Sequence, residues 1–285
     1  MTMTTSIYPD SIYCRNSQFK WGERTYIMGV INVTPDSFSH DGLEYNVTAA
    51  EEQAKRFVDE GIDILDVGGE STRPDFKPIS IEEELHRVIP VIERLTKRIS
   101  TPISIDTYKS EVARQAIDAG ACMINDVWGL RRDPKLAKVA AEKKVPVIIV
   151  QNQRGSIFND LIPELISSLS NSIDYAVESG VDRNNIIIDP GFGFGKTMKQ
   201  NLEIIRRLDD LKVLGRPILL GTSRKSTIGA ILDLPVEQRI EGTAATVAIG
   251  IARGADIIRI HDVPQMTRVI RMSDAIVRKI TGNHN

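Results

Sequence analysis

The chain has 285 residues, 41% hydrophobic and 26% charged, so it can bury a sizeable core as one large domain or two small ones. Its formal net charge of −2 argues against a general nucleic-acid binder, because such proteins usually carry a concentrated basic surplus. No apolar run approaches the roughly 18 residues that span a bilayer, and the N-terminal stretch lacks the apolar segment of a secretory signal. We therefore expect a cytoplasmic protein without nucleic-acid or membrane partners.

The two cysteines, Cys14 and Cys122, lie far apart in the sequence and match no metal-binding or redox spacing. The sequence therefore predicts reduced thiols with a structural role.

The segment SQFKWGERTYIMG (17–29) predicts an N-terminal β-hairpin that turns at Trp21–Arg24 and plugs the amino end of the fold. Short β-branched runs then recur, each with a polar tip and followed by apolar residues at helical spacing. In chain order the runs are YIMGVIN (26–32), DILDVGG (63–69), PISIDT (102–107), CMINDV (122–127), PVIIVQ (146–151), IIIDPG (186–191), PILLGTS (217–223) and DIIRIHDV (256–263).

Eight alternating units indicate an α/β protein with a parallel sheet. In a chain of this length they favour a closed (β/α)₈ TIM barrel over an open doubly wound sheet, which the period alone does not exclude. We expect a single barrel domain over 17–280, an N-terminal extension over 1–16 and a tail over 281–285. Gly61 and Gly120 are expected to end helices, and Pro90 is expected to kink or split its helix.

Polar residues cluster at the carboxyl ends of these runs, where barrel enzymes place their chemistry. They are Asn32, Glu70, Ser71, Thr72, Arg73, Asp106, Asn125, Asp126, Gln151, Asn152, Asp189, Ser223 to Ser226, Arg259 and His261. Any one of them could be a cap or a turn former, but their convergence on one rim indicates a ligand site.

The stretch DPGFGFGKT (189–197) is neither of two known phosphate loops. A P-loop needs glycine at the position of Pro190, and the dinucleotide pattern needs glycine at Lys196. Asp189 closes the preceding strand, and Lys196 is expected to be a solvated lysine.

The rim residues form two chemical groups. Asp106, Asn125, Asp189 and Lys225 offer the acceptors and donors that suit the edge of a flat heterocycle. Arg73, Arg259 and His261 suit a phosphate or pyrophosphate. The helix that begins near Ser226 adds backbone N–H groups for a further anion.

Seven separated motifs, taken in order, resemble the dihydropteroate synthase family: MGVINVTPDSFSHDG, DILDVGGESTRP, SIDT, INDVWG, DPGFGFGKT, GTSRKS and IRIHDV. The resemblance runs from about Ile27 to Val263. It implies a transferase of folate biosynthesis, a target of sulfonamides, that joins p-aminobenzoate to 6-hydroxymethyl-7,8-dihydropterin pyrophosphate with Mg²⁺. It also suggests a homodimer.

The resemblance also implies roles for individual residues. Asp106, Asn125, Asp189 and Lys225 would bind the pterin. Asn32, Thr72, Arg73, Arg259 and His261 would surround the pyrophosphate, with Asn32 as the metal ligand. Ser226 would receive the p-aminobenzoate carboxylate, and Phe38 and Pro74 would wall its ring. Asp106, Arg73, Lys225, Arg259 and His261 would carry the catalysis, and the loops NVTPDSFSHDG and GESTRPDFKP would be lids.

Three places depart from the family pattern. Gln151 and Asn152 stand where Met-His-Asn is usual, so they would replace an apolar contact beneath the pterin and a histidine. His40 and Asp75 alter the two lid loops. Two alternatives stay open at this point: a pterin-dependent methyltransferase barrel, against which the pyrophosphate residues argue, and a non-catalytic pterin-binding paralogue.

Overall fold

A computed structural model describes residues 10–34, 43–71, 77–152, 154 and 158–278. Eight parallel strands form one sheet in the order β8-β7-β6-β5-β4-β3-β10-β9. The strands are β3 (Tyr26–Asn32), β4 (Ile64–Gly68), β5 (Ile103–Asp106), β6 (Met123–Asp126), β7 (Val147–Val150), β8 (Ile186–Asp189), β9 (Leu219–Leu220) and β10 (Ile257–Ile260). A bridge between Ile188 and Ile218 joins the two end strands and closes the barrel. The predicted (β/α)₈ barrel is therefore confirmed.

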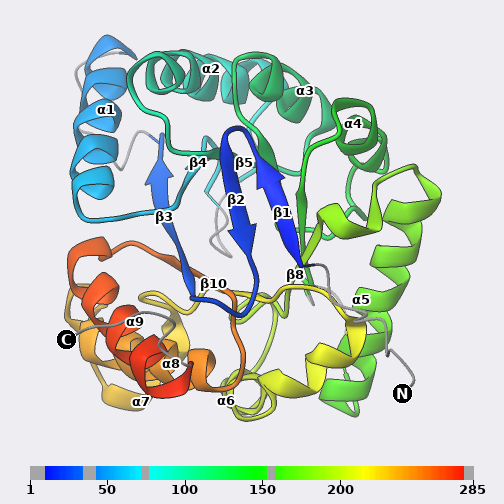
Figure 1. Cartoon of the computed structure of the whole chain (residues 1–285), viewed down its shortest axis with the longest axis vertical. Coiled ribbons are helices and arrows are strands. Elements are labelled where there is room, and N and C mark those ends of the chain that lie inside the picture. Colours follow the sequence, from blue (N-terminus) through cyan, green and yellow to red (C-terminus); the bar gives the residue numbers. More distant parts are fainter. Residues whose placement is uncertain (1–9, 35–42, 72–76, 153, 155–157, 279–285) are drawn as a thin grey trace.

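A ring of helices surrounds the strands (Figure 1). They are α1 (Leu43–Asp59), α2 (Ile81–Arg98), α3 (Ser110–Asp118), α4 (Lys135–Lys143), α5 (Leu161–Glu178), α6 (Met198–Arg206), α7 (Ser226–Leu232), α8 (Ile240–Ala252) and α9 (Val263–Val277). Short 3₁₀ segments lie at Arg183–Asn185, Leu208–Leu214 and Val236–Gln238. In the part of the chain that the structure describes, no helix is both long and apolar enough to cross a membrane.

The interior of the barrel changes from apolar to polar along the strands. Ile64, Met123, Ile148, Ile187 and Ile257 belong to one buried cluster in the lumen. Because side chains alternate along a strand, the residues two positions further on point into the same lumen. These are Asp66, Asn125, Val150, Asp189 and Arg259. The carboxyl end of the lumen is thus lined largely by polar groups.

A hairpin of β1 (Ser11–Cys14) and β2 (Ser17–Lys20) lies across the amino end of the barrel (Figure 1). Ile12, Cys14 and Phe19 join the lumen cluster, so the hairpin is a plug, as expected. The predicted turn at Trp21–Arg24 is wrong, because the chain turns earlier, at Arg15 and Asn16. Arg15 has φ +56° and donates to the carbonyls of Ile99 and Thr96 at 3.2 and 3.1 Å, which fixes the turn against the end of α2.

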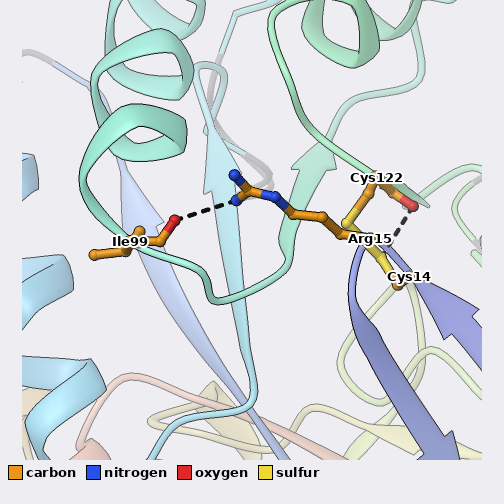
Figure 2. The surroundings of a disulfide bond; sticks show 4 residues. All are labelled: Cys14, Arg15, Ile99 and Cys122. Carbon is orange, nitrogen blue, oxygen red and sulfur yellow. Dashed lines mark hydrogen bonds between the residues drawn. A yellow bond between two sulfur atoms is a disulfide. The ribbon is translucent and has the colours of Figure 1, made fainter.

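Cys14 and Cys122 form a disulfide with a Cα–Cα distance of 5.6 Å (Figure 2). The prediction of two reduced thiols is therefore wrong. The two cysteines are 108 residues apart in the sequence, so nothing in the sequence indicated that the hairpin lies beside the start of β6. The bond links the plug covalently to the strand that carries Asn125.

Pro90 does not split its helix, because α2 runs unbroken from Ile81 to Arg98. Pro90 has no N–H group, so the helix lacks one backbone hydrogen bond. The burial of its apolar face against the barrel, with Val88, Val91 and Leu95, outweighs that loss. Gly61 and Gly120 follow α1 and α3 with φ +87° and +114°, as expected for helix ends.

Candidate active site

The structure brings the described rim residues to the carboxyl ends of the strands. Asp106, Asn125, Asp189 and Arg259 lie in the last two positions of their strands, and His261 follows β10 directly. Lys225 and Ser226 begin α7. Phe38, Thr72, Arg73 and Pro74, like most of both expected lid loops, lie outside the described residues.

Arg259 binds two carboxylates in the lumen. Its Nε donates to Asp66 Oδ2 at 2.6 Å and its Nη2 donates to Asp106 Oδ2 at 2.7 Å. Asn125 Nδ2 donates to the same oxygen of Asp66 at 3.0 Å. Asp66 is fully buried and escaped the sequence analysis, although an aspartate in the middle of the apolar run DILDV was a signal for it. One cation thus faces two anions.

This arrangement favours the protonated form of Asp106. Burial raises its pKa to about 8; Arg259 opposes the increase, and the negative charge of Asp66 adds to it. Two atoms of the network, Asp66 Oδ1 and Asn125 Oδ1, are buried and have no hydrogen-bond partner in the described structure. Such atoms are costly unless a ligand satisfies them, so they mark this layer as a place for a donor-bearing ligand.

Asp189 and Lys225 face each other across the turn after β8. Asp189 Oδ1 accepts from Gly191 N at 2.6 Å, and Lys225 Nζ donates to the carbonyl of Phe192. Burial raises the pKa of Asp189, opposed chiefly by Lys225. Burial also lowers the pKa of Lys225 to about 8, with Asp189 opposing it. Asp189 and Lys225 therefore offer a hydrogen-bond acceptor and a donor that influence each other's charge.

Glycine is required in this turn for close approach. Gly191 and Gly193 have φ +69° and +84°. A Cβ on Gly191 would lie 1.7 Å from the carbonyl oxygen of Gln151, and a Cβ on Gly193 would lie 2.9 Å from Lys225 Cδ. The glycines of DPGFGFGKT thus let the turn approach β7 and Lys225.

Lys196 is not a solvated lysine, so that prediction is wrong. Its Nζ donates to Gln151 O at 3.0 Å, Gln151 Oε1 at 2.6 Å and Gly191 O at 3.0 Å. Burial lowers the pKa of Lys196 to about 7, and Asp189 opposes the decrease. The backbone of the turn can approach the lysine closely, because its glycines carry no side chains that would stand between them.

The expectation that Gln151 replaces an apolar contact beneath the pterin is also wrong. Val150, one residue earlier, lies in the lumen cluster and pairs in register with Asp189. Gln151 instead binds Lys196 through its side chain. Asn152 stabilises the same loop, because its Nδ2 donates to Val127 O at 3.0 Å and its Oδ1 accepts from Arg154 N at 3.1 Å.

His261 is held as a neutral donor. Burial lowers its pKa to about 4, and Arg259 and Arg224 add to the decrease. Its Nδ1 lies 3.0 Å from Ser223 Oγ, which also accepts from the backbone N–H of His261 at 3.2 Å. The hydroxyl of Ser223 can donate to Nδ1, and in that tautomer the ring carries its proton on Nε2 and can donate it to an anion.

Ser226 and Asn32 lie at more open positions of the rim. Both are exposed, Ser226 at the first turn of α7 and Asn32 at the end of β3. Within the described ranges, no three His, Cys, Asp or Glu side chains gather as a metal site. Asn32 contributes a single amide oxygen, which fits a Mg²⁺ that keeps several waters and is bound mainly through substrate phosphates.

A buried ion cluster lies behind the second rim loop. Lys109 Nζ donates to Glu70 Oε2 at 2.7 Å and to Glu84 Oε2 at 2.5 Å. Glu70 Oε2 also accepts from Ile79 N at 3.1 Å, so it connects the two described ends of that loop. The sequence pointed to Glu70 as a rim residue, but nothing in it connected Lys109 or Glu84 to the loop.

Comparison with known proteins agrees with this geometry. The family described as "Pterin binding enzyme" matches residues 28–261. The dihydropteroate synthase of Bacillus subtilis is 50% identical over 273 residues, which are 96% of this chain and 96% of that protein. A dihydropteroate synthase structure from Clostridium difficile in the presence of pteroic acid has a TM-score of 0.90 at 50% identity, covering 92% of this chain and 100% of that one.

A structure of the Xanthomonas albilineans dihydropteroate synthase in complex with 7,8-dihydropteroate has a TM-score of 0.86 at 39% identity, covering 93% of this chain and 98% of that one. The chain belongs to the pterin-binding enzyme family, among the dihydropteroate synthases. Its activity is accordingly that of a transferase of folate biosynthesis, as the motifs implied.

Proposed function

We propose that the carboxyl end of this barrel condenses p-aminobenzoate with 6-hydroxymethyl-7,8-dihydropterin pyrophosphate, releasing 7,8-dihydropteroate and pyrophosphate. The observation that carries the proposal is the buried Asp66–Arg259–Asp106 network beside Asn125 and Asp189. It holds acceptors without partners at a depth where only a flat ligand with edge donors can satisfy them.

The pterin is assigned to the polar layer of the lumen. Asp189 accepts the paired N–H groups of the pterin edge, and Lys225 donates to its ring carbonyl. Asn125 can accept through Oδ1, its buried atom without a partner. Val150 supplies apolar contact at the same level of the lumen.

The pyrophosphate is assigned to a place beside the pterin layer, with Arg73, Thr72, Arg259 and His261. His261 is neutral, so it donates through Nε2–H without adding charge. Asn32 is the residue that would hold Mg²⁺. When bound, Mg²⁺ would neutralise charge on the leaving pyrophosphate. Removing Mg²⁺ with EDTA should abolish turnover and leave binding of pteroic acid unchanged, as calorimetry can show.

The reaction needs opposite charges stabilised in a dry site. The C–O bond to the pyrophosphate breaks, and the electron-rich dihydropterin supports the resulting cationic exocyclic methylene. The arylamine then attacks that carbon, forms the C–N bond and loses a proton to solvent. Ionised Asp106 stabilises the cation, while Arg73, Arg259 and His261 stabilise the leaving group. Ser226 receives the p-aminobenzoate carboxylate at the start of α7, and Phe38 and Pro74 wall its ring.

Asp189→Asn is the direct test of this assignment. An amide cannot accept both N–H groups and presents an NH₂ where an acceptor is needed, so dihydropteroate formation should fall by ~10⁴. The matched control is Asp59→Asn, which makes the same change at the exposed end of α1 and should leave the rate unchanged. A rate within a fewfold of wild type for Asp189→Asn would show that this carboxylate does not bind the pterin.

We also propose a homodimer through the face formed by α7, α8 and α9, which adjoin one another (Figure 1). Large apolar side chains are exposed there: Ile249 at 50%, Met272 at 62% and Ile276 at 72%. Clusters of this kind commonly mark protein interfaces. Sedimentation of an Ile276→Asp variant should show a monomer where the wild type sediments as a dimer.

The cytoplasmic location stays a prediction, and the disulfide is unusual for that compartment.

A further inference from the structure

A cation supported by two aromatic rings stands on the rim beyond the assigned pterin and pyrophosphate residues. The guanidinium carbon of Arg132 lies 4.4 Å from the centroid of the Tyr108 ring and 4.6 Å from that of Trp128. Tyr108 follows β5, while Trp128 and Arg132 follow β6. Stacking on two rings restricts an otherwise flexible side chain, and the planar guanidinium keeps N–H donors at its edge.

A second arginine continues this feature toward the lumen. The Arg154 guanidinium lies 5.6 Å from the Phe194 centroid, and Lys225 Nζ lies 4.5 Å from the same ring. Burial lowers the pKa of Arg154, and the positive charge of Arg132 lowers it further. Arg154 in turn lowers the pKa of Lys225. Arg154 is therefore within electrostatic range of both Arg132 and Lys225.

The nearest acidic side chain in the sequence is committed elsewhere. Asp133 accepts from Ser110 N at 2.8 Å and from Lys135 N at 3.1 Å. Within the described residues, no ion pair joins Arg132 to a carboxylate. A bound anion would therefore stabilise the charge of Arg132.

We propose that Arg132 and Arg154, on Trp128, Tyr108 and Phe194, form a rim subsite for a phosphate-bearing anion. It arises from the loops after β5, β6, β7 and β8, whereas the leaving-group residues Asn32, Arg259 and His261 come from β3 and β10. Under the proposed function, on which this part of the inference rests, its ligand is the pyrophosphate of the incoming substrate. The subsite holds that group while the pterin descends toward Lys225 and Asp189.

The first experiment measures equilibrium binding of inorganic pyrophosphate without Mg²⁺. Trp128 reports it, because the chain has two tryptophans and Trp21→Phe removes the other. In this background we expect a saturable fluorescence change, with the affinity reduced about tenfold or more by Arg132→Ala, since a charge-assisted hydrogen bond is lost. Lys20→Ala removes an exposed cation at the plugged end of the barrel and should change nothing.

The second experiment identifies the source of the anion by stopped-flow association of the dihydropterin pyrophosphate. If the subsite receives the substrate, Arg132→Ala slows association severalfold at low salt, and the difference shrinks as salt is added. If only the equilibrium titration changes, the subsite still exists and takes free pyrophosphate or phosphate. The proposal is overturned if Arg132→Ala binds pyrophosphate as tightly as the parent with an unchanged melting temperature. The titration needs no turnover, so it remains decisive even if no dihydropteroate forms.

Discussion

Asp66 determines how much negative charge the lumen carries. It is fully buried, and Arg259 shares its charge between this carboxylate and that of Asp106. The two carboxylates and one guanidinium would leave a net negative charge if both acids were ionised. Burial is the main cause of the raised pKa of Asp106, and the negative charge of Asp66 adds to it, because a proton on Asp106 removes the net charge.

The raised pKa predicts how activity depends on pH. In the proposed mechanism only ionised Asp106 stabilises the pterin cation, so kcat/KM should rise with pH up to about 8. Asp66→Asn removes the neighbouring negative charge, and the midpoint should move downward by about one unit or more. Substrate ionisation is common to both proteins, so the difference between their pH–rate profiles isolates Asp106. Coincident profiles would show that Asp106 does not titrate in this range.

The same proton affects stability with the opposite sign. Because the folded pKa of Asp106 lies above that of an unfolded aspartate, the folded state binds more protons between the two values. This group therefore stabilises the fold at low pH and loses that contribution as pH rises through about 8. Asp106→Asn should flatten the dependence of the unfolding free energy on pH between the unfolded value of 3.8 and the folded value of about 8, as urea titrations can measure.

Gln151→Met should destabilise the protein and should not restore an apolar contact beneath the pterin. Lys196 would lose its shortest hydrogen bond, to Gln151 Oε1, in a site where burial already disfavours the charge. The expected cost is ~1–3 kcal/mol by urea unfolding. In Lys196→Met the same change at Gln151 should cost much less, since no cation remains to be satisfied. If Gln151→Met costs the same in the wild type and in Lys196→Met, the hydrogen bond between the two side chains does not contribute to stability.

The positions of the candidate residues at strand ends could be predicted from the sequence, whereas Asp66 within a strand and the partners of Lys196 could not. Asp189 and Arg259 follow apolar runs, so their place on the rim could be predicted from the barrel alone. Asp66 interrupts a run and reads equally well as a polar residue facing solvent. The partners of Lys196 lie up to 45 residues away, and a register that differs by one residue exchanges Val150 for Gln151 in the lumen.

At the level of elements, the turn after β8 controls the position of Lys225. Gly193→Ala adds a Cβ 2.9 Å from Lys225 Cδ, and the flexible lysine must move away. Gly22→Ala is the matched control, because its φ of +85° is almost that of Gly193, +84°, and a Cβ there meets nothing within 4 Å. Both variants should lose ~1 kcal/mol of stability from the left-handed conformation, but only Gly193→Ala should bind pteroic acid more weakly in calorimetry.

The elements that the sequence placed correctly are those with strong local patterns. All eight barrel strands form at the β-branched runs, including the two-residue β9, because each is buried on both faces. The sequence predicted the turn of the hairpin too late, at Trp21–Arg24, because the alternation of polar and apolar residues in the hairpin continues into the segment after it. The split expected at Pro90 did not occur, because the packing of α2 on the barrel keeps the helix continuous.

The whole molecule is closed by a covalent bond at the end opposite the site. The Cys14–Cys122 disulfide spans 108 residues, so in the chain-entropy treatment it restricts the unfolded chain by ~4–5 kcal/mol. Reduction should therefore lower the melting temperature by roughly 10 °C, given the usual relation between stability and midpoint for proteins of this size.

The hairpin should nevertheless stay on the barrel after reduction. Ile12 and Phe19 remain buried in the lumen cluster, and Arg15 keeps its bonds to the end of α2. Dihydropteroate synthesis at 25 °C should thus be unchanged, because Asn125 lies at the far end of β6 from Cys122. Differential scanning calorimetry with and without dithiothreitol measures the shift, and the Cys14→Ser, Cys122→Ser double variant should melt at the reduced value under both conditions. Equal midpoints for the oxidised and reduced wild type would mean that apolar packing alone fixes the plug.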